Sequence, residues 1–262
     1  MANTANAALG AAQTYPHINR IGVGDLWVSL RRGWTDFMAT PTQLIFLCLI
    51  YPIVGFVLAR AAAGSALLPL VYPLLAGFAL VGPLAALGLY ELSRRRELGD
   101  AVSWRDMFGV LRSPAIIGIA ILGIALLAVF ALWLGAARGL YNLIMGPDLP
   151  LGASALLSEV LHTSQGHLLI VVGNLVGAGF ALLVLASTVV SFPMMLERDV
   201  TPGEAVQTSL VAFRRNPWVL TLWGVIVAVM LAVGMLLLFV GLAVVLPVLG
   251  HATWHLYRRL VL

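Results

Sequence analysis

The stretch NPWVLTLWGVIVAVMLAVGMLLLFVGLAVVLPVLGHATWHLY, residues 216–257, contains 42 residues without a charged side chain. As a single α-helix it would be roughly 63 Å long, at about 1.5 Å per residue. The hydrocarbon core of a bilayer is about 30 Å thick, and one crossing needs about 20 apolar residues. The run therefore predicts two membrane-spanning helices, and we place the turn between them near Gly234–Gly241.

Four more uncharged runs precede this one, and each is long enough for one crossing of the membrane. They cover Phe37–Ala59, Ala61–Tyr90, Ser113–Ala137 and Val160–Leu196. The sequence thus predicts an all-α membrane protein with six transmembrane helices arranged as three helical hairpins. Residues 1–20 are expected to form a flexible leader, and residues 21–262 a single membrane domain. The approximate spans are 42–62, 67–90, 114–137, 168–194, 217–235 and 238–257.

The composition excludes several classes of protein. Hydrophobic residues make up 61% of the 262 residues and charged residues 10%, whereas soluble domains carry about 25% charged residues. A soluble enzyme, a disordered chain and a nucleic-acid-binding domain are therefore not expected. The single cysteine, Cys48, cannot form a disulfide framework. No Walker, Gly-x-Ser-x-Gly or His-Glu-x-x-His motif is present, so the sequence predicts no enzyme.

The arginine residues predict the orientation, because cytoplasmic loops of membrane proteins are rich in positive charge. Arginine supplies all 15 positive charges of the chain. With six spans and a cytoplasmic N-terminus, 13 of the 15 lie in cytoplasmic segments, and Arg60 and Arg138 are the exceptions. We therefore expect both termini in the cytoplasm.

A short amphipathic helix is predicted before each odd-numbered span. The three stretches are Asp25–Pro41, Asp100–Pro114 and Thr201–Pro217. Thr201 and Glu204 form the pattern of a capping box at the start of the third. A proline also recurs near the cytoplasmic end of each even-numbered span, at Pro83, Pro193 and Pro247. These features predict a pseudo-threefold repeat, although amphipathic loop helices are also common in membrane proteins without repeats. The residues expected to anchor the chain at the membrane interface are Trp27, Trp34, Trp104, Trp254 and Tyr257.

Three separated motifs resemble a known family. They are Gly77-Phe78 through Gly82-Pro83 running into Gly88–Arg95, then Ser191–Asp199, and finally Pro247–Arg258; Gly33–Asp36 also fits. These stretches resemble the bacterial integral membrane family called Domain of Unknown Function 2189. The resemblance implies a multi-span protein of the bacterial inner membrane without an established activity. Some members of the family are labelled as putative cytochrome c oxidases.

The histidines support that label poorly. Haem in a helical bundle needs axial histidines on facing helices inside the membrane, and none of the five histidines lies at mid-membrane in the predicted topology. His251 and His255 share one face of the last helix and could chelate Zn²⁺ or Cu²⁺ with Glu91 or Glu197 as further ligands. The alternatives are a hydrogen-bonded structural cluster with one of these glutamates, or an ordinary interfacial belt. No cofactor is predicted.

Within the spans, Gly173-x-x-x-Gly177 is typical of close helix packing. The polar side chains Asn174, Ser187, Thr188 and Ser191 could line a pathway or make ordinary interhelical hydrogen bonds. No acidic residue is predicted in the hydrocarbon core, which disfavours a proton-coupled transporter.

The resulting hypothesis is a non-enzymatic accessory, scaffold or assembly protein for a membrane complex, for which the family label suggests a respiratory oxidase. The alternative is a small transporter or lipid-handling channel, which the prolines at Pro69, Pro73 and Pro83 would suit if they break the second span. The expected partners are the lipid bilayer and a membrane-protein complex, and no nucleic acid.

Overall fold

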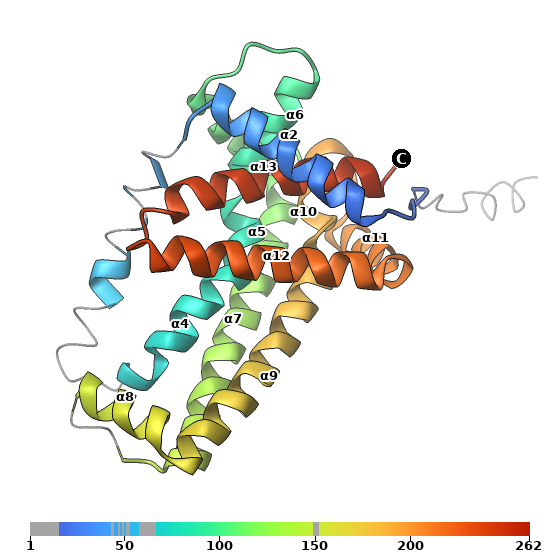
Figure 1. Cartoon of the computed structure of the whole chain (residues 1–262). Helices are drawn as coiled ribbons and strands as arrows, with labels where there is room; N and C mark the ends of the chain where they lie inside the picture. The colour runs from blue at the N-terminus through green and yellow to red at the C-terminus, as the bar shows by residue number, and fades with distance from the viewer. Residues whose placement is uncertain are drawn as a thin grey trace, which may run out of the picture.

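The chain forms an assembly of helices in a computed structural model (Figure 1). The structure describes residues 16–42, 45, 46, 48, 50, 53–57, 67–148 and 152–262. No strand occurs in these ranges, where the extended pairing is limited to a bridge between Ile18 and Val261. The first predicted span, residues 42–62, and most of the predicted leader lie largely outside the described residues.

Four described segments are long and apolar enough to cross a membrane. They are Leu68–Glu97, Ile116–Met145, Ser164–Glu197 and Pro217–Leu236. Two of them contain long regular helices, α7 (Ile116–Met145) and α9 (Ser164–Thr188), and the last is α12 (Pro217–Leu236). The all-helical prediction is confirmed, with about four candidate spans among the described residues.

The segment Leu68–Glu97 is broken into short pieces. In order these are η1 (Leu68–Leu70), α4 (Val71–Gly77), η2 (Phe78–Val81), α5 (Gly82–Ala85) and α6 (Leu87–Glu97). Pro83 lies in the first turn of α5, where a residue without an N–H is tolerated. The predicted single span is therefore a series of α and 3₁₀ turns, because proline cannot donate to the preceding turn.

A second break separates α9 from α10 (Ser191–Glu197), which contains Pro193. The neighbouring helix α11 (Pro202–Arg215) satisfies backbone groups freed at this break. Ser209 accepts a hydrogen bond from the N–H of Val190 at 3.3 Å and donates one to the carbonyl of Ala186 at 2.8 Å. Pro247 differs, because α13 (Leu242–Leu260) continues through it without interruption.

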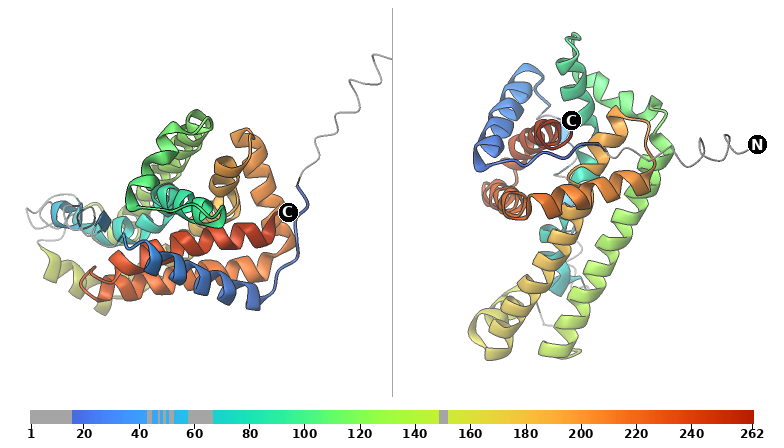
Figure 2. Two further views of the ribbon diagram at one scale, coloured as in Figure 1. Left: turned by 90° about the horizontal axis from the view of Figure 1, so that it is seen from above. Right: turned by 90° about the vertical axis from the view of Figure 1, so that its right-hand side faces the viewer.

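The helices form two groups with different directions (Figure 1). α4, α7 and α9 run alongside one another towards α8 (Ala153–His162). α2 (Val23–Ala39), α13 and α12 are stacked crosswise at the other end, as the views in Figure 2 also show. The turn between α12 and α13 occupies residues 237–241, inside the predicted window. α13 is not among the candidate spans.

Glycine permits two close approaches inside this structure. A Cβ on Gly177 of α9 would lie 3.1 Å from the Trp133 ring of α7, so this position supports the predicted close packing. A Cβ on Gly173 would meet nothing within 4 Å among the described residues, so close packing at this position stays a prediction. Gly33 of α2 is closer still, since its Cβ would lie 2.6 Å from the backbone nitrogen of Ala252 in α13.

The two ends of the described chain also lie together. The N–H of Asn19 donates to the carbonyl of Leu260 at 2.8 Å, and the N–H of Leu262 donates to the carbonyl of His17 at 3.1 Å. α2 therefore runs antiparallel to α13 and closes the crosswise layer.

Candidate functional site

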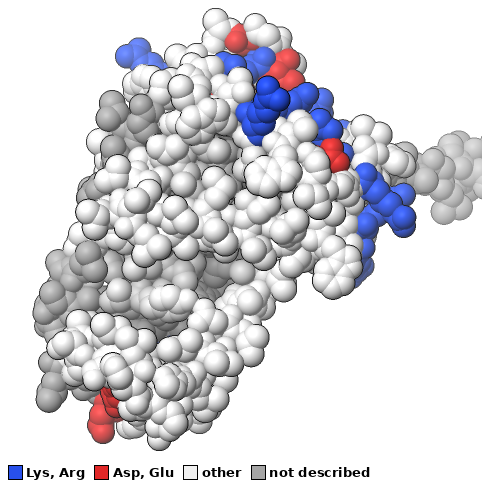
Figure 3. Space-filling view, in the orientation of Figure 1, with Lys and Arg blue, Asp and Glu red and all other residues white. Residues whose placement is uncertain are grey.

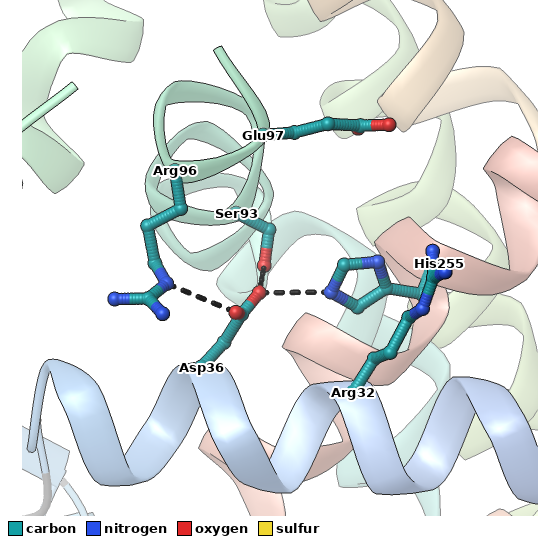
Figure 4. A pocket seen from close by; sticks show the side chains of 6 residues that line it. All are labelled: Arg32, Asp36, Ser93, Arg96, Glu97 and His255. Atoms are coloured by element: carbon teal, nitrogen blue, oxygen red, sulfur yellow. Dashed lines mark hydrogen bonds and ion pairs between the residues drawn. The ribbon is translucent and has the colours of Figure 1, made fainter. Parts of the chain in front are cut away.

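A cluster of polar side chains occupies the place where α2, α6 and α13 meet (Figure 4). α2 contributes Asp36, and α6 contributes Ser93 and Arg96 on successive turns. α13 contributes His251 and His255, whose spacing of four places both on one helical face. Asp36, Ser93 and His251 are buried, although the surrounding helices are predominantly apolar.

Asp36 is the centre of this cluster. Its carboxylate accepts hydrogen bonds from Ser93 Oγ at 2.6 Å, His255 Nε2 at 2.9 Å and Arg96 Nε at 3.0 Å. Burial alone would raise the pKa of Asp36, but the hydrogen bonds from His255 and Ser93 outweigh burial and hold the pKa at about 2. Asp36 is therefore ionised at neutral pH and fixes three side chains from two other helices.

The hydrogen bonds determine the tautomer of His251. Ser93 has one hydroxyl proton, and its contact with the acceptor-only carboxylate of Asp36 uses it. The Nδ1 of His251, 2.8 Å from Ser93 Oγ, must then carry the proton and donate to Ser93. Its Nε2 is left as an acceptor, and this buried atom has no hydrogen-bond partner among the residues that the structure describes.

A small cavity of about 230 Å³ opens beside the cluster. Its lining residues are Arg32, Asp36, Ser93, Arg96, Glu97 and His255 (Figure 4). Glu97 links the cavity wall to α13, because it accepts hydrogen bonds from Trp254 Nε1 at 3.0 Å and Arg258 Nε at 3.1 Å.

The predicted partners of the two histidines are different in the structure. Glu91 accepts from Arg94 at 2.8 Å and Arg95 at 2.7 Å, and Glu197 pairs with Tyr257 and Arg258. Neither glutamate reaches the histidines. The predicted cluster with Glu91 or Glu197 is therefore wrong in its acidic partner, which is Asp36.

The metal prediction gains no geometric support. His251 Nδ1 hydrogen-bonds Ser93 and His255 Nε2 hydrogen-bonds Asp36, so each of these two nitrogens already has a hydrogen-bond partner. In the described part of the chain, no group of three or more His, Cys, Asp or Glu side chains is placed to hold a metal ion.

One sequence pattern indicates a role for Asp36, although hydropathy does not reveal it. Asp36 follows Gly33 by one helical turn, in the stretch Gly33–Asp36 that resembles the family. The glycine brings α2 against α13, and the aspartate then lies within reach of His255. Its 219-residue separation from His255 is why spacing alone did not pair them.

The predicted interfacial aromatic residues fall into two sets. Trp27, Trp34 and Trp104 are exposed, at 64%, 49% and 45%. Trp254 and Tyr257 are instead buried in the protein, with polar atoms bonded to Glu97 and Glu197. The prediction that these two anchor the chain in the headgroups is therefore wrong, because their polar ends find acceptors on neighbouring helices.

Comparison with known proteins agrees with the helical membrane architecture. Residues 71–197 match the family model described as "Predicted integral membrane protein (DUF2189)", which confirms the resemblance over that stretch. The motifs at Gly33–Asp36 and Pro247–Arg258 lie outside the matched residues. No curated protein and no solved structure matches the chain.

Proposed function

Starting from the match of residues 71–197 to a family of predicted integral membrane proteins, we propose that this protein is a non-enzymatic scaffold or assembly factor. It would act in the bacterial inner membrane and present aromatic helices to a partner membrane complex, such as a respiratory oxidase. The observation that carries the proposal is the outer face of α2.

That face is exposed and rich in aromatic side chains, with Arg31 among them, and α2 is held in place from its other side. Trp27, Trp34 and Met38 are 64%, 49% and 60% exposed on one side of α2. The opposite side is fixed to α13 by the close approach at Gly33 and by the hydrogen bonds of Asp36. Aromatic residues dominate the binding energy at protein interfaces. The exposed aromatic side chains of α2, on a helix held in place by its buried face, therefore have the features of a docking surface.

The packing of the amphipathic helices supports the proposed pseudo-threefold repeat. η3 (Trp104–Arg112) packs on α6, α11 packs on α9 and α10, and α2 packs on α13. η3 and α11 therefore each pack on the even-numbered predicted span that precedes them in the sequence. α2, which has no preceding span, packs on the sixth predicted span, and this contact would close a ring of three repeats.

The start of each amphipathic helix supports the same relation. The acidic residue at the third position, Asp25, Asp106 or Glu204, accepts a hydrogen bond from the backbone N–H at the N-cap. Asp25 pairs with Arg259 at 2.6 Å, and Asp106 pairs with Arg95 at 3.0 Å. Both arginines stand twelve positions after a proline, Pro247 or Pro83.

The proposed orientation places η3 in the cytoplasm and α8 in the periplasm. Figure 3 supports it, because the positive side chains gather at one end of the molecule and are absent from the visible face of the opposite end. Six spans with both termini inside remain part of this proposal.

Cysteine labelling tests the orientation. Ala101→Cys and Ser154→Cys, each in a Cys48→Ala background, place an exposed thiol near η3 or in α8. A membrane-impermeant maleimide added to intact spheroplasts should label the cysteine at 154, and should label the one at 101 only after the cells are opened. Labelling at position 101 in intact cells would contradict the proposed orientation.

Site-specific cross-linking tests the scaffold role. A photo-reactive phenylalanine analogue at Trp27 or Trp34 should give a discrete cross-linked protein band in native membranes. The same analogue at Ile124 or Leu132, exposed at 67% and 66% on the apolar α7, serves as a lipid-facing control. Equal smears from both helices, with no discrete band from α2, would contradict a protein-docking face.

The broken segment Leu68–Glu97 favours the alternative of a small transporter or lipid-handling channel, because discontinuous helices are typical of transport sites. Within the apolar region, Tyr72 Oη also donates to Asn174 Oδ1 at 2.7 Å. Purified protein that moves lipid or solute across liposome membranes, while giving no cross-linked partner, would favour the alternative.

A further inference from the structure

A second cavity, of about 510 Å³, lies outside the Asp36 cluster and is lined by four arginines. Arg94 and Arg95 come from α6, Arg112 from the end of η3, and Arg198 from the residue after α10. The apolar part of the wall is formed by Pro114, Ala115, Met195 and Leu196. We propose that this cavity binds the phosphate group of an anionic phospholipid.

The charges in the wall are incompletely compensated. Glu91 forms ion pairs with both Arg94 and Arg95. Asp106 forms a second ion pair with Arg95. Arg112 is exposed and makes no ion pair with any residue that the structure describes.

Arg198 is also weakly paired. Its Nε is 3.5 Å from Glu197, beyond ordinary hydrogen-bond length, and the oxygens of that carboxylate already accept from Tyr257 and Arg258. Asp199 is the remaining acidic residue of the wall and is exposed. Arg112 therefore has its donor groups free for an added anion. Arg198 keeps donor groups beyond its contacts with Glu197 and the Tyr257 hydroxyl. Guanidinium groups bind phosphate through paired, charge-assisted hydrogen bonds.

The position of the cavity selects a lipid over a soluble phosphate. The candidate spans Leu68–Glu97 and Ser164–Glu197 end beside it, and Ile116–Met145 begins there. The cavity thus lies at headgroup depth, with the apolar wall beside the arginines suited to the glycerol and upper acyl chain. The first turn of α7, without a side-chain cap at Ala115, adds the positive end of a long helix dipole. The inference concerns this cavity and is independent of the scaffold role.

Native mass spectrometry of the full-length protein in an uncharged detergent tests the site. Short-chain phosphatidylglycerol should bind at about one per protein, and inorganic phosphate should compete weakly. Arg112→Gln combined with Arg198→Gln should weaken the lipid affinity about tenfold or more, because each arginine near a membrane surface contributes substantially to binding an anionic headgroup.

The matched control is Arg214→Gln combined with Arg215→Gln, which removes the same charge from exposed positions in the last turn of α11, outside the cavity. This pair should leave the affinity unchanged within about twofold. Equal losses in both pairs, no bound phosphatidylglycerol, or binding of inorganic phosphate without binding of lipid would each overturn the proposal. If the first double variant does not fold, the exposed Arg112→Gln alone provides the test by the same criteria.

Discussion

Replacing Gly33 by alanine is expected to lower the free energy of unfolding by about 2 kcal/mol or more, the usual cost of overpacking a tight contact. The added Cβ would lie 2.6 Å from the Ala252 nitrogen and 2.7 Å from the Val248 carbonyl oxygen. Both are backbone atoms of α13 and cannot move aside by rotating a side chain. α2 must therefore shift away from α13, which also separates Asp36 from His255.

Thermal unfolding in detergent measures this effect, with an expected fall in Tm of roughly 5 °C or more for a protein of this size. Gly24→Ala is the control on the same helix, because a Cβ there meets no described residue within 4 Å. That substitution should be neutral or slightly stabilising, since alanine is a better helix former than glycine. Equal destabilisation by both variants would show that helix propensity, and not the contact with α13, governs the outcome.

Asp36→Asn is expected to have an effect of similar size, about 2 to 3 kcal/mol of lost stability. The amide keeps the shape but removes the negative charge that pairs with Arg96 and accepts the hydrogen bond of His255, and breaking a buried ion pair is costly. The expected loss lies below the usual range of about 3 to 5 kcal/mol because the side chain of Arg96 is 30% exposed. Asp148→Asn, at an exposed position without a described ion pair, should cost little.

The pH dependence of stability checks the same residue independently. The pKa of Asp36 is about 2, below the ordinary 3.8 for aspartate. A depressed carboxyl pKa contributes stability that is fully present above about pH 4 and is lost as the pH falls towards 2. The Tm of the wild-type protein should therefore fall more steeply than that of Asp36→Asn across this interval. Parallel curves would contradict the role of the ionised carboxylate.

Hydropathy and local capping patterns predicted much of the architecture. The turn at residues 237–241, the long helices α7 and α9, and the capping box of Thr201 and Glu204 all follow from residues close together in the sequence. These features depend on run length and on the chemistry of a single helical turn, which a linear sequence displays directly.

The candidate site was predicted incompletely for a physical reason. His251 and His255 were identified, but their acidic partner depends on how α2 crosses α13, and hydropathy contains no information about that register. Trp254 and Tyr257 were placed at the membrane surface because an aromatic ring with a polar end suits headgroups and a partly polar protein interior equally well. The acceptors that decide between these environments, Glu97 and Glu197, come from distant helices.

The contact between α2 and α13 also fixes the order in which the protein can be completed. Asp25 and Arg259, which pair across these helices, are 234 positions apart. At about 5–20 residues per second, the ribosome delivers the second partner on the order of ten to fifty seconds after the first. Until α13 has been synthesised, the Gly33 side of α2 lacks the helix it packs against, and Asp36 lacks His255 although Ser93 and Arg96 of α6 are delivered earlier. α2 is therefore the first amphipathic helix to be synthesised and the last to pack against its partner helix. A chain truncated before α13 leaves the Gly33 side of α2 exposed.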